Sequence, residues 1–191
     1  DNGFEVDYVD ILENGQVDLE QLKDLIRKDT ILVSIGYVDS ELGIVQPIDQ
    51  IGALLKGYPN CYFHVDATQA VGKIKVSFEN IDLITFSAHK FYGLNGCGVL
   101  IKKQNLAIEP LIHGGMSTTV YRSGTPTLAL IASLEKALIL ATEGLEDKYE
   151  YVRTLNNKLR ETLKKYPMIR INSTEKASPF ILNISLKGIK S

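Results

Sequence analysis

The spacing of apolar positions changes along the chain, and each change marks a predicted element. After Asp18, apolar residues recur every three or four positions as far as Lys28, which predicts a helix with a capping box formed by Asp18 and Gln21. Residues 31–35 are almost continuously apolar, which predicts a strand buried on both sides of a sheet. Pro47 then predicts the start of a second helix, because its missing N–H is not needed there.

Further strands are predicted at residues 62–65, 82–86 and 97–101, so helices and strands alternate up to about Ile101. This alternation predicts an α/β fold with a parallel sheet. From Thr127 the pattern is helical in two pieces around Gly144, and after Pro167 residues 180–184 predict another strand. We therefore expect part of a large domain over residues 1–126, a linking helical region over 127–166, and the start of a small domain over 167–191.

Composition narrows the function classes. The 21 basic and 23 acidic residues are scattered, which argues against a nucleic-acid partner. No apolar run reaches the roughly 18 residues of a membrane span. Cys61 and Cys97 have neither metal-ligand spacing nor a disulfide framework, so we expect both to fill small buried sites in a cytoplasmic protein. Both ends of the sequence indicate a chain cut from something longer.

Two residues of opposite charge follow neighbouring predicted strands. Asp66 comes directly after one strand and Lys90 shortly after the next, so both are expected at the edge of the sheet where α/β proteins bind ligands. A carboxylate can keep a pyridine nitrogen protonated, and a desolvated amine can form a Schiff base and shuttle protons. Taken singly, an aspartate in this position is more often a helix cap and a lysine more often a surface residue. Together they predict a pyridoxal phosphate site.

Two longer motifs contain these residues, Phe63-His64-Val65-Asp66-Ala67-Thr68-Gln69 and Ser87-Ala88-His89-Lys90 followed by Tyr92-Gly93. With them the chain resembles the class V aminotransferase family, specifically its cysteine desulfurase branch. The resemblance covers nearly the whole chain, since it extends through residues 33–48 and 113–125 in order.

The resemblance implies the large domain of a fold type I pyridoxal phosphate enzyme, with a mainly parallel sheet flanked by helices and truncated at both ends. It implies a homodimer with a shared site, which converts cysteine to alanine and an enzyme persulfide that a sulfur-acceptor protein can take up. In this family the first phosphate-binding loop precedes the position of Asp1, and the persulfide cysteine lies beyond Ser191. The chain alone is therefore expected to be inactive.

The resemblance also implies individual roles. Lys90 matches the Schiff-base lysine and Asp66 the partner of the ring nitrogen. Gln69 matches a residue that hydrogen-bonds to the ring hydroxyl, and Ser87 and His89 match residues that hold the phosphate. Thr125 matches a threonine that reaches the phosphate bound by the neighbouring subunit, and Asp39 stands where the family has a cofactor-facing asparagine. A carboxylate at Asp39 would repel an ionised ring hydroxyl unless it is protonated or turned away, so the alternative is that Asp39 caps its own loop.

Other functions remain open at the level of sequence. The histidines His64, His89 and His113 have no recognised ligand spacing, so we expect no metal site. Residues 116–121 depart from the usual desulfurase pattern. The alternatives are a non-catalytic dimerisation or scaffold module of the same fold, another class V aminotransferase, or a selenocysteine lyase.

Overall fold

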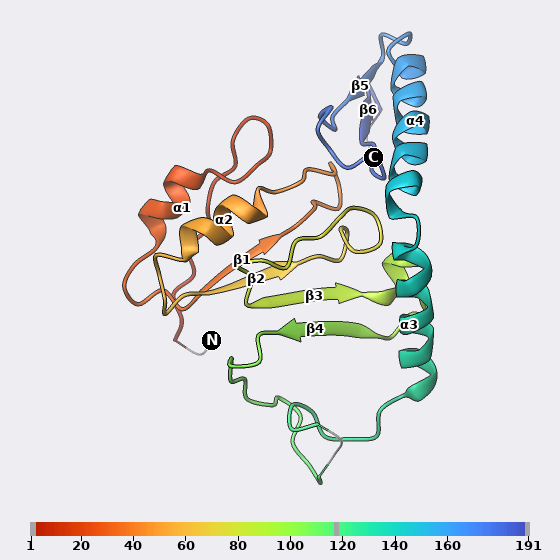
Figure 1. Cartoon of the computed structure of the whole chain (residues 1–191). Helices are drawn as coiled ribbons and strands as arrows, with labels where there is room; N and C mark the ends of the chain where they lie inside the picture. The colour runs from red at the N-terminus through yellow and green to blue at the C-terminus, as the bar shows by residue number, and fades with distance from the viewer. Residues whose placement is uncertain (1–2, 117–118, 190–191) are drawn as a thin grey trace.

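A four-stranded sheet forms the centre of the computed structural model, which describes residues 3–116 and 119–189 (Figure 1). Helices α1 and α2 lie on one side of the sheet, and α3 runs past one end of it. The elements in order are α1 (Leu19–Leu25), β1 (Leu32–Gly36), α2 (Ile48–Leu55), β2 (Tyr62–Asp66), β3 (Leu83–Ser87), the 3-10 turn η1 (Ala88–Phe91), β4 (Gly98–Lys102), α3 (Leu128–Thr142), α4 (Leu145–Leu163), β5 (Ile169–Ile171) and β6 (Ile184–Leu186).

The strands follow one another across the sheet in the order β1-β2-β3-β4. The first three are parallel and β4 is antiparallel to β3. The predicted α/β fold with a mainly parallel sheet is therefore confirmed. Because the three strands are parallel, they end at the same edge of the sheet, where β3 extends two residues beyond the end of β2. The register pairs Gly36 with Asp66, and Asp66 with Thr85.

The core lies on one face of the sheet only. Val33 and Ile35 of β1 are buried with the apolar face of α2, whereas Leu32 is 49% exposed. On the neighbouring strands Tyr62 is 46% and Leu100 50% exposed on the same open face. The prediction that residues 31–35 are buried on both sides is wrong for this chain, because the described helices cover one face and burial along β1 alternates.

The start of α1 differs from the predicted capping box in one respect. Asp18 caps the helix as predicted, since Oδ1 accepts from the N–H groups of Glu20 and Gln21. The side chain of Gln21 instead bonds to Asp10, whose N–H and carboxylate it engages at 2.5 and 2.7 Å. The N–H of Asp18 already donates to the carbonyl of Asp10, so no donor is left for Gln21 to satisfy.

The two long helices meet at Gly144, whose φ of +58° breaks the helical path where the sequence predicts it. Beyond α4 the structure has an antiparallel pair, β5 and β6, rather than the strand predicted at 180–184. Phe180 packs its ring against Tyr149 of α4, with centroids 6.4 Å apart, so this apolar run anchors a loop. The domain boundaries at residues 126 and 166 stay a prediction.

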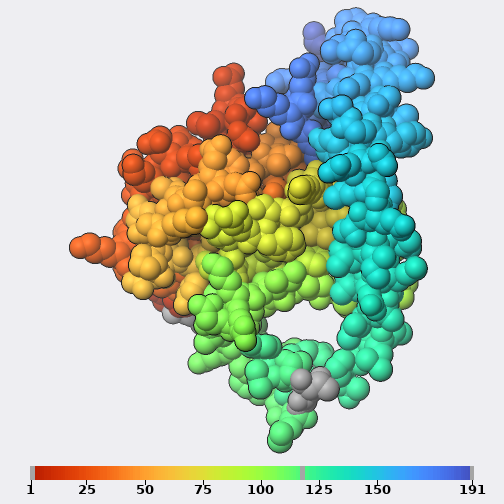
Figure 2. All heavy atoms as spheres, in the orientation of Figure 1, coloured from red at the N-terminus to blue at the C-terminus, as the bar shows by residue number. Residues whose placement is uncertain are grey.

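The segment between β4 and α3 stands away from the sheet, and Figure 2 shows an opening between it and α3. Lys102 of β4 contacts this segment, because its Nζ donates to the carbonyl of Leu106 at 2.8 Å and lies 5.1 Å from the centroid of the Tyr121 ring. Over the described residues, no helix combines the length and apolar character that a membrane crossing requires.

Candidate functional site

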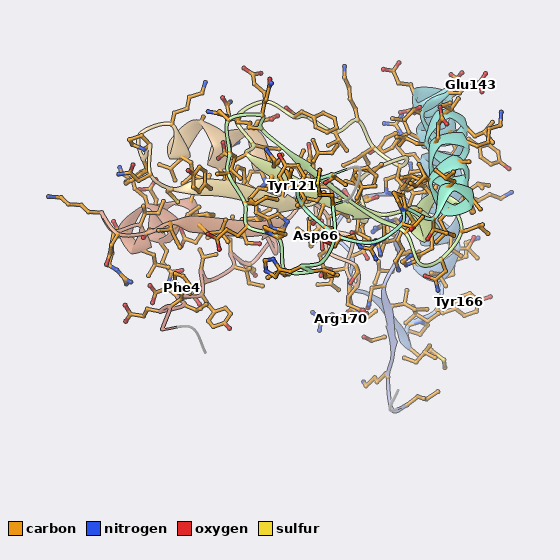
Figure 3. All side chains as sticks on the ribbon, turned by 90° about the horizontal axis from the view of Figure 1, so that it is seen from below. Phe4, Asp66, Tyr121, Glu143, Tyr166 and Arg170 are labelled. Carbon is orange, nitrogen blue, oxygen red and sulfur yellow. The ribbon has the colours of Figure 1, made fainter. Side chains whose placement is uncertain are left out.

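Asp66 is the last residue of β2, and its side chain is exposed on the open face of the sheet (Figure 3). One carboxylate oxygen, Oδ1, accepts from the N–H of Thr68 at 2.9 Å. Beside it on β1 lies Gly36, where an added Cβ would have no atom within 4 Å. The structure therefore leaves open space next to a carboxylate at the carboxyl edge of the sheet.

The turn η1 presents the lysine predicted to bind the cofactor. Ala88 and Phe91 are buried three positions apart, as one face of a 3-10 turn requires, and the Phe91 ring packs on Phe86 with centroids 6.0 Å apart. His89 and Lys90 are thereby left exposed. The burial that would desolvate Lys90 is therefore absent, because η1 turns its two apolar residues inward instead. Among the described residues, the amine of Lys90 has no hydrogen bond or ion pair.

The backbone after Lys90 is held in a fixed path. Tyr92 is fully exposed with a φ of +70°, which is uncommon outside glycine. Gly93 follows, and its N–H donates to the carbonyl of Ala88 at 3.0 Å. A Cβ at Gly93 would lie 2.8 Å from that of Ala88, so glycine is needed for the chain to turn back here.

Gln69 lies in the turn that follows β2 and is half-buried. Its amide oxygen accepts from Lys73 Nζ at 2.5 Å. The pKa of Lys73 is lowered, first because burial desolvates the amine and second because the positive charge of Lys90 acts on it. Burial therefore desolvates Lys73, a residue that the sequence analysis missed. The only signal for it was a glutamine followed four positions later by a lysine.

A chain of side-chain hydrogen bonds crosses three strands on the open face. His64 Nδ1 bonds with Ser34 Oγ at 2.7 Å, and His64 Nε2 with Thr85 Oγ1 at 2.9 Å. The pKa of His64 is lowered because burial disfavours the charged ring, an effect that the nearby Asp66 opposes. Both ring nitrogens are therefore engaged. In the described part of the chain, no three potential metal ligands are gathered together.

Asp39 turns its carboxylate into its own loop. Oδ2 accepts from the N–H of Glu41 at 3.1 Å and from that of Leu42 at 2.5 Å. The backbone closes the same loop, because the N–H of Asp39 donates to Ile44 and its carbonyl accepts from Gly43. This is the arrangement of a loop cap, which the sequence left as the alternative to a cofactor contact.

We expect Asp39→Ala to lower the free energy of unfolding by about 1 kcal/mol, because two backbone N–H groups in a half-buried loop lose their acceptor. Asp39→Asn keeps an oxygen at the same place and should stay within about 0.5 kcal/mol of the wild type. Urea unfolding of the three proteins measures this. Equal stability of the alanine and wild-type proteins would argue against the cap.

The remaining predicted residues lie on separate elements. Ser87 ends β3 and is half-buried, with a side chain that makes no capping bond to η1. Thr125 is exposed in the segment before α3. Cys61 is buried as predicted, which raises the pKa of its thiol, whereas Cys97 is only half-buried. Residues 117 and 118, within the stretch that departs from the desulfurase pattern, lie outside the described residues.

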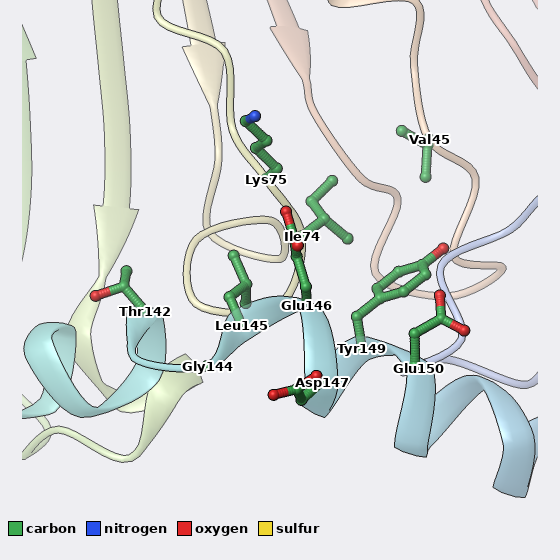
Figure 4. Close-up of a pocket in the computed structure, with 10 residues that line it drawn as sticks. All are labelled: Val45, Ile74, Lys75, Thr142, Gly144, Leu145, Glu146, Asp147, Tyr149 and Glu150. Atoms are coloured by element: carbon green, nitrogen blue, oxygen red, sulfur yellow. The ribbon is translucent and has the colours of Figure 1, made fainter.

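A cavity of about 750 Å³ lies where α3 meets α4 (Figure 4). Glu146, Tyr149 and Glu150 of α4 line one side, and Val45 and Ile74 line the other. None of the predicted cofactor residues lines this cavity. The candidate cofactor residues therefore lie outside this cavity, at the exposed ends of the strands and in the turns that follow them.

Five of the predicted residues lie at or shortly after the ends of two adjacent parallel strands: Asp66, Gln69, Ser87, His89 and Lys90. In open α/β sheets, ligands bind outside the carboxyl ends of the strands, which is where these residues lie. The model of the class V aminotransferases matches residues 1–191, so the chain belongs to the class V aminotransferase family. The resemblance based on the motifs is confirmed.

Individual relatives agree with this assignment. The chain is 40% identical to the cysteine desulfurase IscS of Methanosarcina thermophila, in a match that covers 89% of this chain and 42% of the relative. A solved NifS-like protein superposes with a TM-score of 0.93 at 36% identity, over 98% of this chain and 52% of the other. The structure of SspA in complex with cysteine superposes with a TM-score of 0.80 at 30% identity, over 97% of this chain and 52% of the other. The chain thus spans about half the length of the relatives it matches.

Proposed function

We propose that this chain is the cofactor-binding part of a pyridoxal phosphate-dependent cysteine desulfurase-like enzyme. The observation that carries the proposal is the placement of an exposed carboxylate, Asp66, at the end of β2 and of an exposed amine, Lys90, just beyond the end of the neighbouring parallel strand β3. Membership of the class V aminotransferases and similarity to proteins named cysteine desulfurase support it.

The side chains present suit the chemical groups of pyridoxal phosphate. When bound, this cofactor supplies an electron sink for a substrate carbanion. Asp66 holds the proton at the ring nitrogen, and its second oxygen has no partner among the described residues. Lys90 anchors the cofactor through its amine and moves a proton to or from the substrate carbon. Ser87 and His89 donate hydrogen bonds to the phosphate.

The proposed substrate is cysteine, which is converted to alanine with transfer of sulfur to an enzyme cysteine. The solved relative that carries cysteine supports an amino acid of this class. The proposal includes a homodimer, in which Thr125 reaches the phosphate of the neighbouring subunit, and a separate sulfur-acceptor protein. Cytoplasmic localisation likewise stays a prediction.

Covalent trapping tests the cofactor assignment directly. The chain is incubated with pyridoxal phosphate, reduced with borohydride and digested, and the modified peptide is identified by mass spectrometry. We expect a single pyridoxyl group, located on Lys90, because this exposed amine directly follows the end of β3, beside the strand that ends at Asp66. Failure to incorporate the cofactor, or labelling spread over surface lysines, would contradict the proposal and favour a non-catalytic module of the same fold.

A further inference from the structure

The half-buried lysine Lys73 has no part in the proposed chemistry, yet it lies between two residues that do. It donates to the side chain of Gln69 at 2.5 Å, and it is near enough to Lys90 to feel its charge. Desolvating an amine is costly unless the amine has partners, so a half-buried lysine whose partner is an amide oxygen calls for an explanation.

The backbone holds Lys73 in this position. The N–H of Lys73 donates to the carbonyl of Ala70, which is fully buried. The preceding residue, Gly72, has a φ of +74°, and an added Cβ there would lie 3.0 Å from Cβ of Phe91. Phe91 directly follows Lys90, so the turn that carries Gln69 and Lys73 is pressed against the turn that carries Lys90.

The hydrogen bond from Lys73 to Gln69 decides which end of the Gln69 amide is available to a ligand. An ammonium group has three donors and no acceptor, so Lys73 can bond only to the amide oxygen. The amide nitrogen must then point to the other side of the planar group. In residues 3–116 and 119–189 this nitrogen has no acceptor. Without Lys73, the amide could rotate and present its oxygen, which would repel an ionised hydroxyl.

We propose that Lys73 is a positioning residue, which orients the Gln69 amide so that its nitrogen donates to the ring hydroxyl of pyridoxal phosphate. This inference rests on the proposed function, because the ring hydroxyl is the group that Gln69 would meet. The positive charge on Lys73 also favours an ionised hydroxyl at short range. Lys73 itself does not touch the reacting atoms.

A first experiment needs no cofactor. In the wild-type chain, the side-chain amide signals of Gln69 in a nitrogen-proton NMR spectrum should shift as Lys73 loses its proton. The midpoint should lie below about 10.4, the usual pKa of lysine, because burial and Lys90 both lower the pKa of Lys73. Amide signals that do not respond to this titration would overturn the inference, whatever the chain does with pyridoxal phosphate.

A second experiment measures the effect on the cofactor. Lys73→Met removes the donor at nearly constant length, and we expect roughly tenfold weaker binding of pyridoxal phosphate, the usual size of one lost hydrogen bond to a charged group. The absorption band of the bound cofactor should shift as it does in Gln69→Leu, and the double variant should add nothing further. Lys73→Arg, which retains a cationic donor, should restore most of the binding.

Lys75→Met is the matched control, because Lys75 is exposed two positions away. We expect wild-type affinity and spectrum from it. Wild-type behaviour of Lys73→Met, or additive losses in the double variant, would overturn the inference while leaving the trapping of cofactor on Lys90 intact. If Lys73→Met does not fold, the NMR titration of the wild-type chain decides.

Discussion

Replacing Lys90 by alanine is expected to abolish covalent attachment of pyridoxal phosphate. The wild-type chain should show an absorption band from the linked cofactor that borohydride removes, and Lys90→Ala should show only the spectrum of the free aldehyde. The reason is geometric, because η1 buries its two apolar residues and leaves this amine exposed beyond the end of β3. Spectra recorded with and without borohydride measure the effect.

Two controls separate loss of the amine from loss of the fold. Lys90→Arg keeps the charge but has no primary amine, so it should also fail to attach the cofactor. The free energy of unfolding of both variants should stay within about 0.5 kcal/mol of the wild type, since Lys90 is exposed and makes no hydrogen bond among the described residues. Identical spectra for wild type and Lys90→Ala would refute the cofactor assignment.

Gly72→Ala is expected to lower the free energy of unfolding by about 2–5 kcal/mol. Its φ of +74° costs an alanine about 1–2 kcal/mol. The new Cβ would also lie 2.8 Å from Cβ of Ala141 and 3.0 Å from Cβ of Phe91, and relieving such overpacking costs about 1–3 kcal/mol. Chemical denaturation followed by circular dichroism measures the loss.

Gly57→Ala provides the comparison. Its φ is outside the left-handed region, and the added Cβ would meet only the carbonyl of Leu54 at 3.5 Å, an ordinary contact. We expect this variant to be unchanged or up to about 1 kcal/mol more stable, because alanine restricts the unfolded chain. Equal losses at both glycines would mean that the close approach of Gly72 to η1 is not what stabilises this region.

The sheet could be predicted because its strands are short apolar runs bounded by turn residues, and β2, β3 and β4 each lie within one residue of the predicted range. The three-residue strand β5 was missed, since it is too short to show a period. The placement of Asp66 at the end of β2 and of Lys90 just after the end of β3 could also be predicted, because neighbouring parallel strands end at the same edge of a sheet. That both side chains contact one cofactor stays a prediction.

Contacts that depend on register or on irregular turns could not be predicted. The bonds from His64 to Ser34 and Thr85 join three strands that are about twenty to thirty residues apart in sequence, so only the pairing of the strands reveals them. The bond from Lys73 to Gln69 forms in a turn without a repeating pattern. The open face of the sheet could likewise not be predicted, because an apolar run such as residues 31–35 has the same sequence pattern whether one or both faces are covered.

The loop capped by Asp39 couples two distant parts of the chain mechanically. The carbonyl of Gly43 accepts from the N–H of Ser178 at 2.8 Å, and the carbonyl of Glu41 accepts from the side chain of Asn183 at 3.2 Å. Swinging the segment that carries β6 away from the sheet would break both bonds, at a net cost of about 1–3 kcal/mol. The loop that resists this rotation is therefore the same loop whose conformation the Asp39 carboxylate maintains. Slow hydrogen exchange of the Ser178 amide would indicate that its bond to Gly43 is intact.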